Sequence, residues 1–211
     1  MLSLVASPPF CAKAVFAKDL DTPLRQAAKV TKIHRQRRRA QVTSAGVEER
    51  ACQACTLTAE VFKPFGQVLS AIDDSAKFGK DDAQLSIEPG QIPRFYIMRL
   101  PNRGLVFRKV TNHKNVTQCL GGLGNEPWYI AVAAPELEAP TIEEVTCFEV
   151  PPGTFIKLEC GTWHAGPLFE DDDDDAKRDF YNLECSDTNL TDAESVGFGK
   201  EGVIGRIVPP S

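Results

Sequence analysis

Two histidines in the body of the chain are its first candidates for chemistry. His113 precedes a glycine-rich stretch, and His164 ends the sequence Gly161-Thr-Trp-His. Imidazole is the side chain that changes charge closest to neutral pH, so two of them at strand ends of one small barrel could move protons in a shared pocket. The alternative is that each is an isolated histidine with its hydrogen bonds satisfied. The third histidine, His34, lies in a basic N-terminal stretch and is set aside.

Polar side chains near these histidines could complete such a pocket. Lys157 and Glu159 alternate with apolar residues, so in a strand they share one face. If that face points into the barrel, both line a cavity that His164 closes; if it points outward, both lie in water. Gln118 follows His113 by five residues, a spacing that puts the two on opposite faces of a regular strand unless a bulge intervenes. We predict that the polar face is the inner one.

The elements that must position these residues are predicted to be short β-strands. Segments rich in β-branched and aromatic residues are separated by turns that contain Gly and Pro. They cover residues 68–72, 94–100, 105–110, 116–120, 128–134, 145–150, 154–160 and 180–185. A short helix is expected after Thr58, which can cap it, and before Pro64. Because no long amphipathic helix separates the strands, we predict an all-β fold: a jelly-roll β-barrel over residues 57–208 with a few short helices.

The first fifty residues differ in charge from the rest of the chain. Residues 1–50 carry a net charge of +6 and the remainder carries −11, which gives −5 for the whole chain. Residues 1–18 contain no acid, and four arginines lie between positions 35 and 39. This composition predicts a disordered organellar transit peptide, for a plastid in preference to a mitochondrion. An arm that binds nucleic acid, or a plain tail, is the alternative. No apolar stretch approaches the ~20 residues of a membrane-spanning helix.

The seven cysteines do not indicate a disulfide framework. Their number is odd and their spacing is irregular. Cys52-Gln-Ala-Cys55 lacks the second pair that a zinc site would need, so we interpret it as part of a linker. Cys119, Cys147 and Cys160 lie in apolar segments and are predicted to be buried thiols.

Four groups of residues in the body form an ordered set of motifs. They are His113 with Thr117-Gln118, Tyr129–Pro135, Gly161–His164 with Pro167-Leu168-Phe169, and Asp179-Phe180. Together they resemble the ureidoglycolate lyase family, most closely its plant-type branch, over most of residues 57–205. These proteins, also called ureidoglycolate hydrolases, are single-domain cupins that cleave ureidoglycolate to glyoxylate and urea in allantoin breakdown. The resemblance implies a cupin fold and a carbon–nitrogen lyase.

Three positions depart from the bacterial members, which carry imidazoles there. This chain has Tyr96, Glu159 and Ala165 at these positions. The full metal pattern of cupins, with two histidines one residue apart and a downstream Glu, is also absent. His113, His164 and Glu159 could still form a set of two imidazoles and one carboxylate. A divalent metal could therefore bind, although no cofactor is expected to be required.

The resemblance and the strand alternation together assign roles to the candidates. The implied acid–base residues are His113, His164 and Glu159. The implied substrate-binding residues are Arg94, Tyr96, Gln118 and Lys157, with a cation for the carboxylate and the glutamine for the urea amide. The expected partner is a small hydroxy acid, with a homodimer allowed and neither nucleic acid nor a membrane expected. The alternative functions are a non-catalytic cupin that binds a small organic acid or sugar, and a metal-dependent oxygenase or isomerase.

Overall fold

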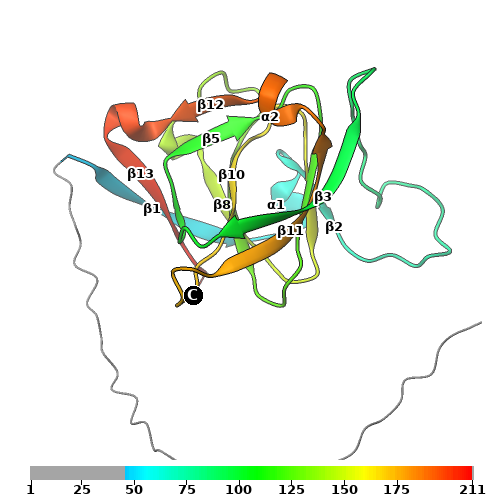
Figure 1. Cartoon of the computed structure of the whole chain (residues 1–211), viewed down its shortest axis with the longest axis horizontal. Helices are drawn as coiled ribbons and strands as arrows, with labels where there is room; N and C mark the ends of the chain where they lie inside the picture. Colours follow the sequence, from blue (N-terminus) through cyan, green and yellow to red (C-terminus); the bar gives the residue numbers. More distant parts are fainter. Residues whose placement is uncertain (1–45, 211) are drawn as a thin grey trace, which may run out of the picture. The chain divides into compact units, whose positions relative to one another are not determined.

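The structure is a computed structural model that describes residues 46–210. The predicted transit peptide therefore lies almost wholly outside the described residues. Two sheets enclose the interior of the described body (Figure 1). The larger sheet contains, in spatial order, β12 (Glu194–Gly197), β5 (Lys109–Asn112), β10 (Trp163–Leu168), β7 (Trp128–Ala133), β8 (Thr146–Val150), β1 (Glu48–Thr56), β13 (Val203–Val208) and β4 (Val106–Phe107). The smaller sheet contains β2 (Gly66–Leu69), β9 (Phe155–Leu158), β6 (Gln118–Gly122), β11 (Lys177–Cys185) and β3 (Pro93–Pro101).

Strand direction and helix content agree with the predicted class. Neighbouring strands run antiparallel, except that β1 pairs in parallel with both β13 and β8. The helical segments are short: α1 (Ala59–Phe62), η1 (Ile142–Glu144), α2 (Thr188–Thr191) and η2 (Phe198–Glu201). The all-β barrel of jelly-roll type, with a few short helices, is confirmed. None of the helices in the described part of the chain is long and apolar enough to cross a membrane.

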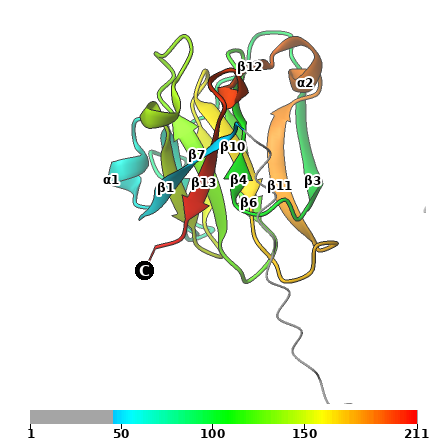
Figure 2. The same ribbon diagram turned by 90° about the vertical axis from the view of Figure 1, so that its left-hand side faces the viewer.

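Two apolar clusters explain why the strand sequences are so hydrophobic. The inner cluster, between the two sheets, comprises Leu57, Phe62, Phe65, Leu120, Trp128, Ile130, Val132, Phe148, Val150, Ile156, Leu158, Phe169 and Phe180. The outer cluster comprises Ala54, Leu105, Phe107, Val110, Tyr129, Ala131, Ala133, Ile142, Cys147, Trp163, Leu168, Phe198, Val203 and Ile207. The larger sheet curls back on itself, so that β1 and β13 cross in front of β7 and β10 (Figure 2). All six residues of β7 are therefore buried, which its continuous apolar sequence predicts.

The short helix α1 begins where the sequence indicates. The Thr58 hydroxyl accepts a hydrogen bond from the Val61 N–H at 3.3 Å, as an N-cap residue does. Phe62, which ends the helix, is fully buried and packs edge-on against Phe148 with ring centroids 5.3 Å apart. The helix thus fixes the start of the inner cluster.

The predicted start of the domain is wrong. Residues 48–53 pair with β13 and residues 54–56 pair with β8, so the folded body begins at or before Glu48 and not at residue 57. The segment from Cys52 to Cys55 is consequently a strand and not a linker. Its sequence hid this because its outward side chains are polar or charged, and because parallel pairing joins it to strands distant in the sequence.

Three further strands and one turn also differ from the prediction. The strands β10, β12 and β13 were not expected, because each contains a glycine and β10 also contains Pro167. The predicted glycine-rich turn belongs in part to β6. There Gly121 is required because the Phe155 ring lies 2.2 Å from the place where a Cβ atom would sit.

Candidate functional site

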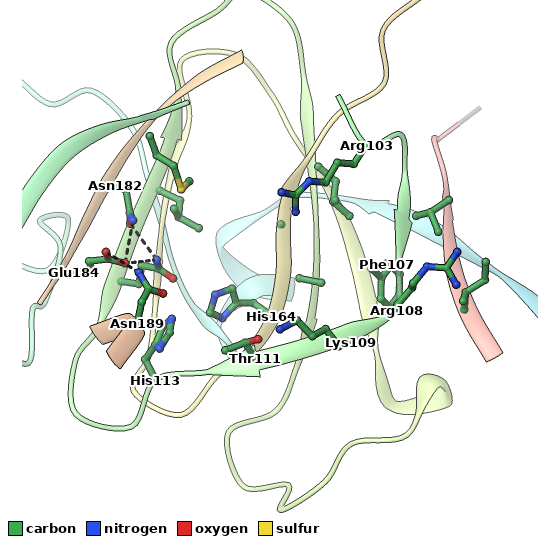
Figure 3. Close-up of a pocket in the computed structure, with 18 of the residues that line it drawn as sticks. Arg103, Phe107, Arg108, Lys109, Thr111, His113, His164, Asn182, Glu184 and Asn189 are labelled. Atoms are coloured by element: carbon green, nitrogen blue, oxygen red, sulfur yellow. Dashed lines mark hydrogen bonds between the residues drawn. The ribbon is translucent and has the colours of Figure 1, made fainter. Parts of the chain in front are cut away.

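A cavity of about 800 Å³ opens between the two sheets, next to the inner cluster. The five-stranded sheet contributes Tyr96, Met98, Gln118, Leu120, Asn182 and Glu184 to its wall. The opposite side and its connections contribute Arg103, Arg108, Lys109, Thr111, His113 and His164 (Figure 3). Four of the predicted site residues therefore meet here: Tyr96, His113, Gln118 and His164.

Alternation along β11 leads from the core to this cavity. Phe180 packs in the inner cluster, and the next two residues on the same face, Asn182 and Glu184, line the cavity. Asn182 and Glu184 are only 1% and 2% exposed. The inner face of one strand thus changes from an apolar to a charged environment within five residues.

Glu184 is a buried carboxylate that orders the polar side chains around it. Its Oε2 accepts hydrogen bonds from Gln118 Nε2 at 3.3 Å and from Asn182 Nδ2 at 3.0 Å. Its Oε1 accepts from the Tyr96 hydroxyl at 3.3 Å and from Asn189 Nδ2 at 3.4 Å. Burial raises the pKa of Tyr96, which keeps the phenol protonated and able to donate. These four donors offset the cost of removing a carboxylate from water.

This arrangement fixes which end of Gln118 is free. The amide nitrogen donates to Glu184 and also to Asn182 Oδ1 at 3.0 Å. The amide oxygen is buried and has no hydrogen-bond partner in residues 46–210. Gln118 also lines a small recess together with His113 and His164. An unpaired buried acceptor is costly, so this oxygen is suited to receive an N–H donor from a ligand.

The two histidines converge because their strands pair. His164 in β10 lies opposite Thr111 in β5, and the His113 carbonyl accepts a 2.6 Å hydrogen bond from the Gly161 N–H. The imidazole centroids are 5.3 Å apart. No bulge is needed to bring His113 and Gln118 together, contrary to the expectation for a single strand, because the chain crosses from one sheet to the other between them.

Backbone carbonyls set the tautomer of both rings. His113 Nδ1 lies 2.5 Å from the Asp192 carbonyl oxygen, and His164 Nδ1 lies 3.2 Å from the Thr162 carbonyl oxygen. A carbonyl oxygen only accepts, so Nδ1 carries the proton in each neutral ring and Nε2 carries the lone pair. The Asp192 carboxylate also accepts from the backbone N–H groups of Lys114 and Asn115, which holds the loop after His113 in place.

His164 is held in its neutral form. Burial lowers its pKa to about 4, with a further contribution from the neighbouring His113. At neutral pH its Nε2 is therefore a hydrogen-bond acceptor and a base. An anion bound beside the ring would favour the imidazolium and raise this pKa again.

Cationic side chains lie on the opposite side of the cavity from Glu184 and its hydrogen-bond donors. Figure 3 shows Arg103, Lys109 and Arg108 on one side and Asn182, Glu184 and Asn189 on the other, with His164 between them. Among the side chains that the structure describes, in residues 46–199 and 202–210, neither Arg103 nor Arg108 has an ion-pair partner. Two guanidinium groups without carboxylate partners make this side of the cavity attractive to an anion.

Lys157 does not line this cavity, which corrects the predicted orientation of β9. Glu159 does not line it either, but it borders the small recess that His113 and His164 share. Ile156 and Leu158 face the inner cluster, and Lys157 faces the other way. Its ammonium donates to the Gln84 carbonyl at 3.1 Å and pairs with Glu159. The alternation was predicted correctly but the inner face was not. The loop that contains Gln84 buries Lys157 to 1% exposure on the outside of the barrel, while the Glu159 side chain remains 45% exposed.

Arg94 occupies the edge of the site and not its interior. Its guanidinium lies 3.7 Å from the Tyr96 ring centroid, and Nη1 lies 3.8 Å from Glu184 Oε1. The side chain is 47% exposed and does not line the cavity. Trp163, the neighbour of His164, points into the outer cluster on the opposite face of β10 and donates to the Leu137 carbonyl at 2.8 Å.

The residues at hand fit a metal ion poorly. His113 and His164 could each offer an Nε2 lone pair, and Gln118 could offer its free oxygen. Glu159, the predicted carboxylate ligand, is instead paired with Lys157. In residues 46–210 no group of three or more His, Cys, Asp or Glu side chains could hold a metal ion. The two imidazoles can still act as acid and base without a metal.

The sequence reasoning missed several residues of this site: Arg103, Arg108, Lys109, Asn182, Glu184 and Asn189. A signal existed for two of them, because Asn182 and Glu184 share a strand face with Phe180, whose apolar ring indicates the inner side. The same test applied to β9 would have placed Lys157 outside. Arg103 and Asn189 lie outside the strands, and no periodicity indicates where their side chains point.

Comparisons with known proteins add little to this picture. No protein-family model matches the chain, and no curated protein matches it. Among solved structures, it is similar to an oxalate decarboxylase from Bacillus subtilis that was studied for its Mn(II) centres. The TM-score is 0.32 and the identity 11%, over 65% of this chain and 29% of that chain. The chain thus spans less than a third of that protein, and a likeness of this size carries no argument about function. The resemblance to ureidoglycolate lyases rests on the motifs alone.

Proposed function

We propose that the protein is a lyase of the ureidoglycolate type, which releases urea from a small hydroxy acid by acid–base catalysis. The supporting observation is that two imidazoles lie in one cavity, between an amide oxygen and guanidinium groups that have no partner among the described side chains. Ureidoglycolate carries a carboxylate, a hydroxyl and a ureido group on one carbon. The cavity offers a chemical counterpart to each of the three.

The proposed reaction needs one proton to be moved between two groups on the same carbon. His164 Nε2 takes the hydroxyl proton, the oxygen electrons form the carbonyl of glyoxylate, and the carbon–nitrogen bond breaks. The imidazolium then gives its proton to the departing ureido nitrogen, which leaves as urea. Because both groups are attached to one carbon, a single imidazole can serve as base and then as acid. The Nε2 lone pair of His113 accepts a hydrogen bond from a ureido N–H group, since the single hydroxyl proton goes to His164.

Substrate recognition divides between the two sides of the cavity. Arg103 binds the carboxylate, since it is free of intramolecular ion pairs in the described body. The ureido N–H groups donate to Gln118 Oε1, the acceptor that has no partner within residues 46–210. The Glu184 carboxylate keeps Gln118 in this orientation by holding its nitrogen. The bound carboxylate also raises the pKa of His164 from about 4, which makes its Nε2 a stronger base when substrate is present.

Release of urea and glyoxylate from ureidoglycolate is the direct test. The wild-type protein is expected to turn over this substrate after treatment with a chelator, because no step uses a metal. His164→Ala is expected to lower kcat/KM by about 10²–10⁴-fold, the usual contribution of one acid–base group. Circular dichroism and the melting temperature of the variant should show that the fold persists.

A matched control separates catalysis from binding. Lys157→Met removes a cation that was also a candidate for the substrate carboxylate but lies outside the barrel, so kcat/KM per folded molecule should not change. If wild-type protein binds ureidoglycolate without releasing urea, the lyase proposal fails and the non-catalytic cupin is correct. If activity disappears with chelator and returns with a divalent ion, the metal-free mechanism fails.

For the N-terminal segment we propose organelle targeting, to a plastid in preference to a mitochondrion. The support is its basic, acid-poor composition. Because β1 begins at Glu48 and pairs with two other strands, processing should leave residues from 48 onward intact. N-terminal sequencing of the native protein tests this: a mature terminus that begins after Glu48 would contradict it, and so would an intact Met1 in the cytosol.

A further inference from the structure

Two cysteine thiols meet where β1 lies beside β8. Ala54 in β1 is the partner of Cys147 in β8, and Cys52 lies two residues before Ala54 on the same face of the strand. Cys147 belongs to the outer cluster and the partly buried Cys52 packs against it, although the two are far apart along the chain. Cys52 Sγ donates to the Arg50 carbonyl oxygen at 3.7 Å, and each of the two thiols shifts the pKa of the other. The strand pairing therefore puts Cys52 and Cys147 at diagonal positions on the same face of two neighbouring strands.

The cysteine that looks like the natural partner in the sequence is on the wrong side. Cys55 follows Cys52 by three residues, and an odd spacing in a strand puts side chains on opposite faces. Cys55 is accordingly exposed, while Cys52 is half-buried and Cys147 is 2% exposed. The structure thus separates the two members of the CxxC sequence and joins Cys52 to Cys147 instead.

The two thiols have different chemical characters. The hydrogen bond from Cys147 lowers the pKa of Cys52 to about 7, against the opposing effects of burial and of the Glu143 carboxylate. The same hydrogen bond and burial raise the pKa of Cys147. Only the thiolate is nucleophilic, and Cys52 is also the more accessible of the two. Cys52 is therefore suited to react first with a reagent from solution.

We propose that Cys52 and Cys147 form a reversible disulfide, a redox-modification site that ties β1 to β8. The oxidant is a small-molecule disulfide such as oxidised glutathione. The Cys52 thiolate attacks one of its sulfurs and expels a thiolate, which leaves a mixed disulfide on Cys52. Cys147 then gives up its proton and its thiolate attacks the Cys52 sulfur, and the second departing thiolate takes up that proton. Two protein thiols are oxidised and one external disulfide is reduced to two thiols.

The cross-link would lie at a switch in the pairing of β1. Residues 48–53 pair with β13, and residues 54–56 pair with β8. Figure 1 shows β1 running beside both strands. Joining β1 to β8 closes a long loop of the chain, which restricts the unfolded state and is expected to stabilise the fold. The disulfide would thus fasten the first strand of the folded body to the rest of the larger sheet.

Oxidation of the purified full chain in glutathione buffers tests the proposal. After free thiols are blocked, peptide mapping by mass spectrometry should find one intramolecular cross-link, between Cys52 and Cys147. The melting temperature should rise by several degrees, and dithiothreitol should reverse the rise. Cys55→Ser should behave as the wild type does, because its side chain lies on the other face.

Two further variants distinguish the order of the steps. Cys147→Ser should stop at a glutathione adduct on Cys52, whereas Cys52→Ser should leave Cys147 unmodified. The melting temperatures of the reduced variants show whether each still folds, and Cys147→Ala serves if the serine variant does not. A cross-link that contains Cys55 would overturn the proposal. So would the absence of any Cys52–Cys147 cross-link in fully oxidised glutathione.

Discussion

The space between the two sheets has an apolar end and a polar end, and the same strands build both. At the apolar end, Trp128 packs edge-on against Phe180 with ring centroids 5.7 Å apart. At the polar end, β11 instead presents Asn182 and Glu184 to the cavity. Alternation divides the residues of a strand between two faces, and the position along the strand decides whether a residue on the inward face enters the core or the site.

The two ends satisfy their buried groups in different ways. The apolar end is stabilised by the area it removes from water and by close packing. The polar end buries a carboxylate and two amides. The free-energy cost of burying the Glu184 carboxylate is offset because it accepts hydrogen bonds from four neighbouring donors. The free oxygen of Gln118 is the part of this network that remains for a ligand. Core residues are thus expected to set stability, and cavity residues to set activity.

The largest expected effect on stability is at the apolar end. Phe180→Ala removes a fully buried ring from the inner cluster, which should lower the free energy of unfolding by about 3–5 kcal/mol. Because Phe180 is separated from Glu184 by four residues along β11, kcat of the molecules that remain folded should change little. Urea denaturation and the activity assay measure the two effects. A large loss of kcat with little loss of stability would break the contrast between the ends.

The fold class was readable from the sequence, because the alternation of short apolar segments with Gly and Pro turns indicates strands directly. β1 was not, since its pairing in parallel with β8 and β13 depends on contacts far away in the sequence. In the site, His113, Gln118 and His164 were identified from motifs. Lys157 was placed on the wrong side of β9, because alternation defines two faces without saying which one a loop will cover.

The buried His164 at the polar end makes the stability of the fold depend on pH. His164 has a pKa of about 4 in the folded state and an ordinary value of about 6.5 when unfolded. Between these values the unfolded chain binds a proton that the folded chain does not. Stability should therefore fall as the pH drops from about 6.5 to about 4, with this group contributing at most about 3 kcal/mol.

Comparing variants isolates this contribution. His164→Gln removes the titrating ring, so the difference in unfolding free energy between the variant and the wild type should depend on pH in that window and become constant below it. Phe180→Ala carries no such group and should lower stability by the same amount at every pH. Parallel curves for wild type and His164→Gln would show that His164 is not held neutral, and the polar end would then lose its assigned base.

The smallest expected effect sharpens the contrast within the polar end itself, between an arginine inside the cavity and one outside it. Arg103→Ala should raise KM for ureidoglycolate about tenfold, since a hydrogen-bonded charge pair with the carboxylate is lost, and should leave stability nearly unchanged because the side chain is exposed. Arg99, on β3, binds Asp179 at 2.8 Å and does not line this cavity. Arg99→Ala removes the same charge from the protein, so it controls for a general change in the electrostatic field. Equal KM values for the two variants would mean that the carboxylate is not held at Arg103. A rise in KM confined to Arg103→Ala would support binding of the anion between this guanidinium and His164. Added salt should then raise the KM of the wild type, because it screens the attraction between the guanidinium and the carboxylate.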